Sequence, residues 1–139
     1  MRVTNCGRYA VTAMLDLAMQ QSGSPVTVAE VAARHDLPAT YMEQLFSRLR
    51  RAGLVKGTRG PGGGYQLAKE PWEISVANVI AAVGESVDTT RCGGSRDCQR
   101  DGECLTHDLW EALNDQVLDF LSSVTLQTLA QKAFSRQSP

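Results

Sequence analysis

Apolar side chains recur at intervals of three and four residues along most of the chain, the spacing that gathers them on one face of an α-helix. The first such segment predicts a helix from about Arg8 to Gln21, closed by Gly23-Ser24-Pro25. Its predicted buried positions are Val11, Met14, Leu15, Ala18 and Met19.

Two short helices are predicted next, joined by a turn. The first follows Thr27 as N-cap, with Glu30 three residues later in a capping-box pattern, and ends before Pro38. The second runs from about residue 38 to Ala52, with Gly53 as its C-terminal stop. Its apolar positions are Met42, Leu45, Phe46 and Leu49. A short helix, a turn and a second helix with a polar, basic outer face are typical of a helix-turn-helix.

A glycine-rich segment follows the second of these helices. Apolar residues at both ends of 54–67, with five of the chain's twelve glycines between positions 57 and 64, predict a β-hairpin. A hairpin in this place is the wing of a winged-helix domain, with Arg59 at its tip. A phosphate-binding nucleotide loop is disfavoured, because no strand-then-helix context surrounds residues 60–64 and no Gly-Lys-Ser/Thr follows them.

The carboxyl-terminal half predicts an apolar helix over 74–83, a polar loop over 84–103 and a long helix over 105–124. The apolar stripe of the long helix is Leu105, Leu109, Leu113, Val117, Phe120, Leu121 and Val124. So long a stripe must either fold back on the amino-terminal half or pack against a second copy, and we favour the second. A short helix from Thr125 and a frayed tail over 135–139 complete the prediction.

Charge divides the chain at the same place. Its net charge is −1, but residues 1–69 carry nine basic and four acidic residues (+5), and residues 70–139 five basic and eleven acidic ones (−6). This asymmetry suggests that the first half meets a polyanion. Neither a membrane-spanning run nor a signal-peptide core is apparent, so we expect a cytoplasmic protein without membrane contact.

Three of the four cysteines, Cys92, Cys98 and Cys104, fall within thirteen residues, and His107 follows. Three thiols and an imidazole are a metal-binding set. Five residues separate each cysteine from the next, unlike the short Cys-x2-Cys spacing of structural zinc sites. An iron–sulfur cluster is larger and tolerates wider spacing. Surface cysteines without a ligand role are the alternative.

The expected fold is therefore mainly α with a small β-hairpin. A winged helix-turn-helix DNA-binding domain is predicted over 1–70, and a cysteine-rich cluster loop with a long dimerisation helix over 71–139. The expected DNA-binding residues lie near the amino terminus, on the second helix of the helix-turn-helix and on the wing. They are Arg2, Thr40, Tyr41, Glu43, Gln44, Ser47, Arg48, Arg50, Arg51, Arg59, Gly60 and Gly62.

Nearly the whole chain, to about residue 130, resembles the Rrf-type winged-helix transcription factors, and more narrowly their iron–sulfur-cluster branch. The segments that carry the resemblance are 7–11 (GRYAV), 41–46 (YMEQLF), 59–65 (RGPGGGY), Arg91-Cys92 and 104–107 (CLTH). Asn5-Cys6 departs from the family pattern, which often places a lysine before the glycine, so a positive charge near DNA is lost there.

The resemblance implies a homodimer that binds double-stranded promoter DNA and represses or activates cluster-assembly genes according to cluster supply. It also implies one [2Fe–2S] cluster per subunit on Cys92, Cys98, Cys104 and His107, delivered by the cluster-assembly machinery, whose presence changes the choice of DNA site.

Two other classes remain open. A relative with a [4Fe–4S] cluster on the three cysteines would sense nitric oxide, although His107 argues against it. A zinc-stabilised interaction module would be colourless, whereas a cluster protein is red-brown. Enzymatic activity is not expected, because no nucleophile–base or paired-carboxylate arrangement is apparent.

Overall fold

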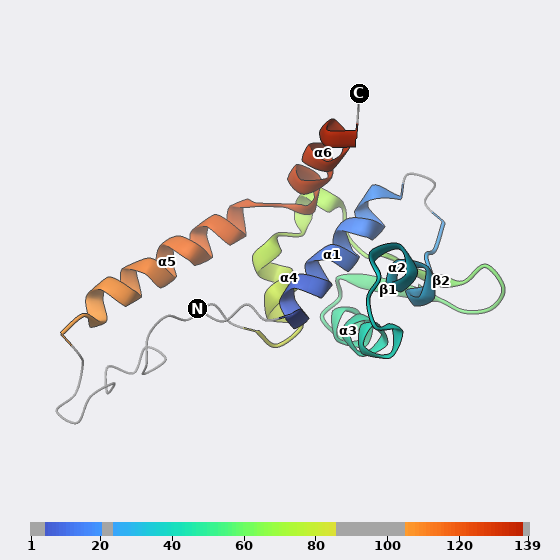
Figure 1. The fold of residues 1–139 in the computed structure, drawn as a ribbon, viewed down its shortest axis with the longest axis horizontal. Helices are drawn as coiled ribbons and strands as arrows, with labels where there is room; N and C mark the ends of the chain where they lie inside the picture. Colours follow the sequence, from blue (N-terminus) through green and yellow to red (C-terminus); the bar gives the residue numbers. More distant parts are fainter. Residues whose placement is uncertain (1–4, 21–23, 86–104, 138–139) are drawn as a thin grey trace.

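The computed structural model describes residues 5–20, 24–85 and 105–137 (Figure 1). The elements follow one another along the chain as α1 (Asn5–Met19), α2 (Val28–His35), α3 (Ala39–Arg51), β1 (Val55–Thr58), β2 (Gly64–Leu67), η1 (Pro71–Glu73), α4 (Val76–Ala82), α5 (His107–Ser123) and α6 (Leu126–Gln137). The mainly helical fold with one antiparallel hairpin is the predicted one.

The helix-turn-helix forms as its sequence predicts. The Thr27 hydroxyl accepts a hydrogen bond from the Glu30 amide at 3.0 Å and caps α2. The chain turns at Asp36, whose φ of 53° ends the helix before Pro38. All four predicted apolar positions of α3 are buried, and Gly53 follows the helix with a φ of 79°.

The wing is anchored at its base. Strand β1 pairs antiparallel with β2, from Val55 opposite Leu67 to Thr58 opposite Gly64. Tyr65 also exchanges backbone hydrogen bonds of 2.9 and 2.7 Å with Val26, so the chain before α2 is tied to the hairpin. A side chain at Gly64 would meet the Val26 carbonyl group at 2.5 Å, which explains why glycine stands there.

The predicted buried stripe of α1 is only partly correct. Of its five members only Met14 is fully buried, and the core face is instead formed by Ala10, Ala13, Met14 and Leu17. The reason is that α1 is central: α3, α4, α6 and β2 all contact it. Small alanines allow close approach on the core side, while Val11 and Ala18 pack at its margins.

The carboxyl-terminal half differs in detail from its prediction. Helix α4 begins at Val76, after a Ser75–Asn78 capping box, and the 3-10 helix η1 was not predicted. Helix α6 is longer than expected and continues to Gln137, so the frayed tail predicted from Ser135 is wrong for residues 135–137. Leu126, fully buried at its start, fixes α6 to the core, and its amide donates to the Ile74 carbonyl oxygen at 3.0 Å.

Helix α5 extends away from the rest of the protein (Figure 1). Leu109, Leu113 and Phe120, which share one face of α5, are 59%, 37% and 65% exposed, so the described part of the chain leaves this apolar face uncovered, and α5 does not fold back on the amino-terminal half. No helix among the described residues is both long and apolar enough to span a bilayer. The main core includes Ile74, Val79 and Leu126 beside residues of α1 and α3. The boundary at residue 70 stays a prediction.

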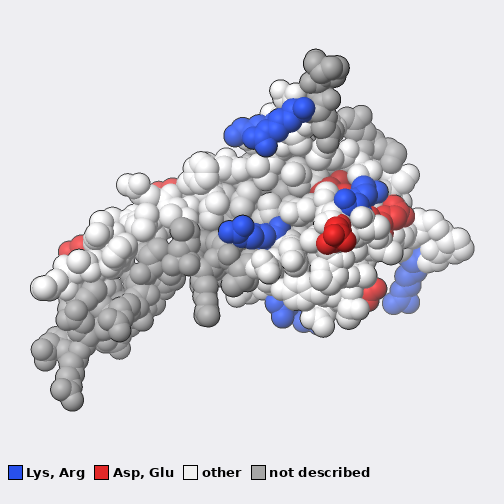
Figure 2. All heavy atoms as spheres, viewed as in Figure 1, with Lys and Arg blue, Asp and Glu red and all other residues white. Residues whose placement is uncertain are grey.

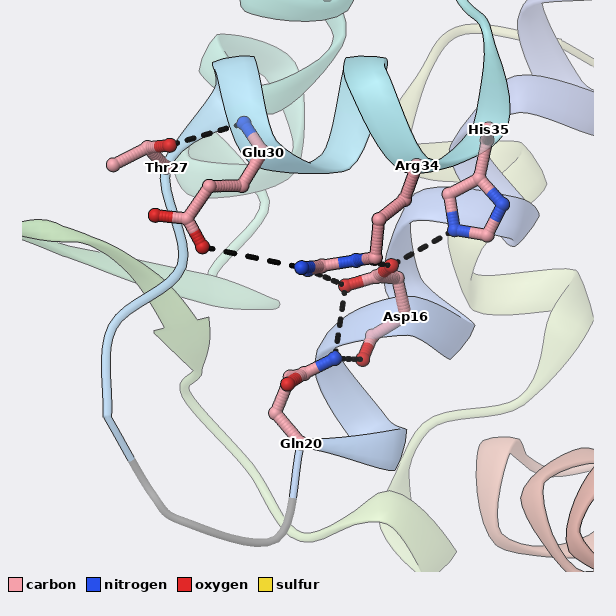
Figure 3. A network of polar contacts seen from close by, with 6 residues as sticks. All are labelled: Asp16, Gln20, Thr27, Glu30, Arg34 and His35. Atoms are coloured by element: carbon pink, nitrogen blue, oxygen red, sulfur yellow. Dashed lines mark hydrogen bonds and ion pairs between the residues drawn. The ribbon is translucent and has the colours of Figure 1, made fainter.

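A buried carboxylate connects α1 to α2 (Figure 3). The Asp16 side chain, 3% exposed, accepts hydrogen bonds from Arg34 Nη2 at 2.7 Å and Nε at 2.8 Å. His35 Nε2 lies 2.8 Å from Asp16 Oδ2, and Gln20 Nε2 donates to Oδ1 at 3.3 Å. This network fixes the first helix of the helix-turn-helix on α1.

Burial by itself would raise the pKa of Asp16, but the hydrogen bonds from Arg34 and His35 outweigh it and hold the pKa below the ordinary value of 3.8. A depressed folded-state pKa adds stability that is complete above the unfolded-state pKa. That stability is lost as the pH falls through the folded-state pKa.

We predict that Asp16→Asn lowers the free energy of unfolding at pH 7 by about 2–3 kcal/mol, because a buried charged acceptor of the Arg34 fork is removed. Below about pH 4 the wild-type protein should lose stability more steeply than the variant. Urea unfolding across pH checks both. Glu30→Gln is the control, because the 3.9 Å Glu30–Arg34 pair is exposed and should contribute less than about 1 kcal/mol. Equal losses in the two variants would contradict the prediction.

Candidate nucleic-acid interface

The outer face of α3 is polar along its length. Opposite the buried residues, the helical period places Thr40, Gln44, Ser47 and Arg51 in one row, all exposed except the half-buried Ser47. A helix with its apolar face buried and such a row outward can enter the major groove of DNA, where hydroxyl, amide and guanidinium groups reach base edges and phosphates.

The two flanks of α3 differ. Glu43 and Arg50 lie on one flank and are exposed, and no ion pair is found for Glu43 within the described ranges. Tyr41 and Arg48 lie two turns apart on the other flank, which faces α1 and α4. The ring of Tyr41 packs edge-on against Tyr9, with centroids 5.9 Å apart. Its hydrogen bond with the Cys6 thiol, and secondly burial, raise the pKa of Tyr41.

Arg48 is engaged by the protein itself. Its Nη1 donates to the Val83 carbonyl oxygen at 3.0 Å and to Cys6 Sγ at 4.0 Å. The basic outer face of α3 predicted that Arg48 contacts DNA. The structure adds a contact of Arg48 with the end of α4, which no pattern in the sequence revealed. The sequence analysis also missed the network around Asp16, because its members are far apart in the chain. The one signal in the sequence was an acidic residue inside an otherwise apolar stretch.

The wing carries the remaining described candidates. Arg59, Gly60 and Gly62 are exposed in the turn between β1 and β2. The φ angles of Gly60 and Gly62, 91° and 75°, are ones that glycine adopts without strain. The rings of Phe46 on α3 and Tyr65 on β2 stack with centroids 4.9 Å apart, so the wing and α3 are held as one unit. Arg2 lies outside the described residues.

Basic and acidic side chains lie on different parts of the described structure. Figure 2 shows Lys and Arg side chains at the edges near α3 and the hairpin, whereas α5 displays only acidic patches. Helix α5 contains Asp108, Glu111, Asp115 and Asp119 and no lysine or arginine. Phosphate repels such a helix, so the face that presents α3 and the wing is the one suited to DNA.

The predicted cluster ligands are only partly visible. Cys92, Cys98 and Cys104 lie outside the described residues. His107 begins α5 and is buried, 2% exposed, with Nε2 3.4 Å from Glu111 Oε2. Within residues 5–20, 24–85 and 105–137 no three His, Cys, Asp or Glu side chains are grouped to hold a metal. A buried imidazole three residues after a thiol fits a soft, mixed-ligand metal site by its chemistry.

Fold and interface together define a winged helix-turn-helix DNA-binding protein. The sequence model of the Rrf2 family, described as an iron-dependent transcriptional regulator, matches residues 3–132, and the chain belongs to this family.

Similar proteins and similar solved structures are regulators of the same family. The chain is 53% identical over 129 residues to the HTH-type transcriptional regulator IscR of Vibrio cholerae, covering 93% of this chain and 75% of the relative. It is 55% identical over the same length to that of Photorhabdus laumondii, covering 93% and 79%. The structure of T. potens IscR superimposes with a TM-score of 0.83 at 34% identity, covering 100% of this chain and 93% of that one.

A second structural neighbour broadens the class. The structure of CymR, the global cysteine regulator of B. subtilis, has a TM-score of 0.80 at 34% identity, covering 95% of this chain and 98% of that one. The predicted resemblance is thus confirmed. The protein is a transcription regulator, and its relatives are DNA-binding regulators rather than enzymes.

We predict that Arg59→Ala weakens DNA binding with little dependence on sequence, because a wing-tip guanidinium meets phosphate or a groove wall. Gln44→Ala should instead change the preference among site variants, since a side chain on the outer face of α3 reaches base edges. Titration of duplex variants at fixed salt measures both. An unaltered preference in Gln44→Ala would contradict the proposed docking.

Proposed function

We propose that this protein is a homodimeric regulator of cluster-assembly genes that senses iron–sulfur cluster supply through one [2Fe–2S] cluster per subunit. The observation that carries the proposal is the position of the ligand set. It begins at Cys92, seven residues after the described end of the α4 segment, and closes on the buried His107 at the start of α5. The set thus connects the helix that contacts α3 with the helix that presents an apolar face.

Cys92, Cys98, Cys104 and His107 would hold the cluster. With three thiolates and a neutral imidazole around a 2+ core, the site carries a charge of −1, one negative charge fewer than four thiolates would give. The cluster-assembly machinery, which delivers clusters to proteins of the same compartment, would be its donor. Because promoter DNA and this machinery share the cytoplasm of a bacterium, the protein would act there.

A second copy of the chain would cover α5. Its exposed Leu109, Leu113 and Phe120 lie on one face and form an apolar surface on an extended helix. Two copies of α3 related by a two-fold axis would read two half-sites of a promoter, as helix-turn-helix dimers do. In each copy the DNA contacts would come from the wing, from Arg2 and from the predicted positions of α3 other than Tyr41 and Arg48, whose side chains contact α1 and α4.

Anaerobic purification tests the proposal directly. We expect two iron and two sulfide per chain, a red-brown colour and a dimer by sedimentation, with DNA affinity that changes when the cluster is removed. Four iron per chain would point to the nitric-oxide-sensing class, and a colourless zinc protein to an interaction module. DNA affinity that is the same with and without the cluster would refute cluster sensing.

We predict that His107→Cys gives a lower reduction potential and a longer-lived cluster, because a fourth thiolate adds negative charge and is a stronger ligand for iron than imidazole. Redox titration and the decay of visible absorbance in air measure the two properties. Asp108→Cys is the matched control, since it adds a thiol at the next, exposed position and leaves His107 in place. A potential and lifetime unchanged in His107→Cys would exclude histidine as a ligand.

We further predict that Glu43 gates site choice. An exposed carboxylate on the DNA-facing side of α3 is repelled by phosphates unless a base donor, such as the amino group of cytosine, satisfies it. At sites without that donor the desolvated anion costs about 1–3 kcal/mol. Glu43→Ala in cluster-free protein should therefore gain affinity only at sites that the wild-type apoprotein binds poorly. If Glu43→Ala gained equal affinity at both kinds of site at fixed salt, Glu43 would be only a nonspecific repulsive charge.

A further inference from the structure

Arg48 connects the recognition helix α3 to the end of α4. Its Nη1 donates to the carbonyl oxygen of Val83, 35 residues further along the chain, at 3.0 Å in a partly buried contact. The same nitrogen lies 4.0 Å from Cys6 Sγ on α1, and Cys6 Sγ lies 3.9 Å from the Val83 carbonyl oxygen. Three helices therefore meet at one guanidinium group.

The carbonyl that Arg48 binds belongs to a defined helix end. The amide of Gly84, with a φ of 79°, donates to the Ala81 carbonyl oxygen at 3.0 Å, and the amide of Glu85 donates to that of Ile80 at 3.1 Å. These two bonds form a Schellman motif, which satisfies two of the last carbonyls of α4 but not that of its C-cap, Val83. Arg48 donates the shorter hydrogen bond to this carbonyl oxygen, at 3.0 Å, and the Cys6 thiol donates a longer one at 3.9 Å.

A second contact fixes the same flank. Tyr41, two turns before Arg48, packs its ring edge-on against that of Tyr9 on α1, with ring centroids 5.9 Å apart. Arg48 and Tyr41 thus hold one side of α3 against the end of α4 and the start of α1. A displacement of Val83 to Glu85 would pass to α3 through the polar contacts of Arg48, because hydrogen bonds are directional whereas the apolar packing beneath them tolerates small shifts in angle.

We propose that Arg48 is a positioning residue that couples the end of α4 to the orientation of the recognition helix, so that cluster occupancy is transmitted to the DNA-reading face through the Arg48–Val83 contact. This rests on the proposed function, because the first predicted ligand, Cys92, follows Glu85 by seven residues. If the cluster site and the DNA-reading face are coupled through this one contact, a specific result is expected. Removing the contact must remove the dependence of DNA binding on the cluster without removing DNA binding itself.

Two other roles for Arg48 predict different results. A phosphate contact would lower affinity for every duplex and would reduce the salt dependence of binding by about one unit of log–log slope. A contribution to folding alone would lower the melting temperature and leave cluster dependence intact. Loss of coupling in an Arg48 variant would lower neither the affinity for every duplex nor the salt slope, but it would abolish the cluster-dependent change in DNA binding.

The test uses the full chain with and without its cluster, and two duplexes selected from a randomised pool, one by each form. The variants are Arg48→Met and Arg48→Gln, because both residues keep the helix propensity of arginine at an exposed position. Arg51→Met is the matched control, one turn away in the outward row. Iron content and visible absorbance verify equal loading of the proteins.

In the wild-type protein we expect cluster loading to change the ratio of the two Kd values at least about five-fold. Both Arg48 variants should change it less than two-fold, with a wild-type salt slope in the cluster-free form. Arg51→Met should weaken binding to both duplexes, lower the slope by about one and keep the wild-type change in ratio.

Arg48 variants that keep the wild-type change in ratio overturn this proposal alone, whether or not their salt slope falls. A wild-type protein whose ratio is indifferent to the cluster overturns the proposed function, and this proposal with it.

Discussion

The burial of one face of α3 is the constraint on which the rest of the structure depends. Met42, Leu45, Phe46 and Leu49 are each no more than 1% exposed, so α3 cannot turn another face inward or slide by a residue without opening the core, and only small shifts in its angle remain open. Because that face is fixed, the opposite row is necessarily outward, and the two flanks acquire different neighbours. The wing follows from the same burial, since Phe46 stacks on Tyr65 at the start of β2.

Polar contacts fix the angles between helices that apolar packing alone does not determine. Apolar packing is tolerant of small shifts in angle, whereas a bidentate Arg–carboxylate pair and a capped carbonyl are directional. The Asp16–Arg34 fork fixes α2 on α1, and Arg48 fixes α3 on the end of α4. Burying Asp16 has a desolvation cost that its partners more than offset, so the carboxylate both adds stability and selects one arrangement of α1 and α2.

The sequence was sufficient for elements whose signals are local. The Thr27 cap, the apolar row of α3 and the glycines of the wing each follow from a few neighbouring residues, and the family resemblance rests on the same segments. The buried stripe of α1 was mispredicted because a central helix is packed on several sides, and periodicity then no longer marks one face. The Asp16 network and the Arg48–Val83 contact join residues 18 and 35 positions apart, which no local pattern encodes. For the cluster ligands, spacing and residue type remain the basis of the assignment, with His107 as the member within the described structure.

Hydrogen exchange at the end of α4, compared between cluster-loaded and cluster-free protein, is the most direct test of the account. The amides of Gly84 and Glu85 form the Schellman bonds beside Val83, so they report on the point where α4, α3 and the ligand-bearing segment meet. The account predicts that loading the cluster slows exchange at these two amides and changes exchange along α3, while the amides of α2 are unaffected. Identical exchange at Gly84, Glu85 and α3 in the two forms would contradict it.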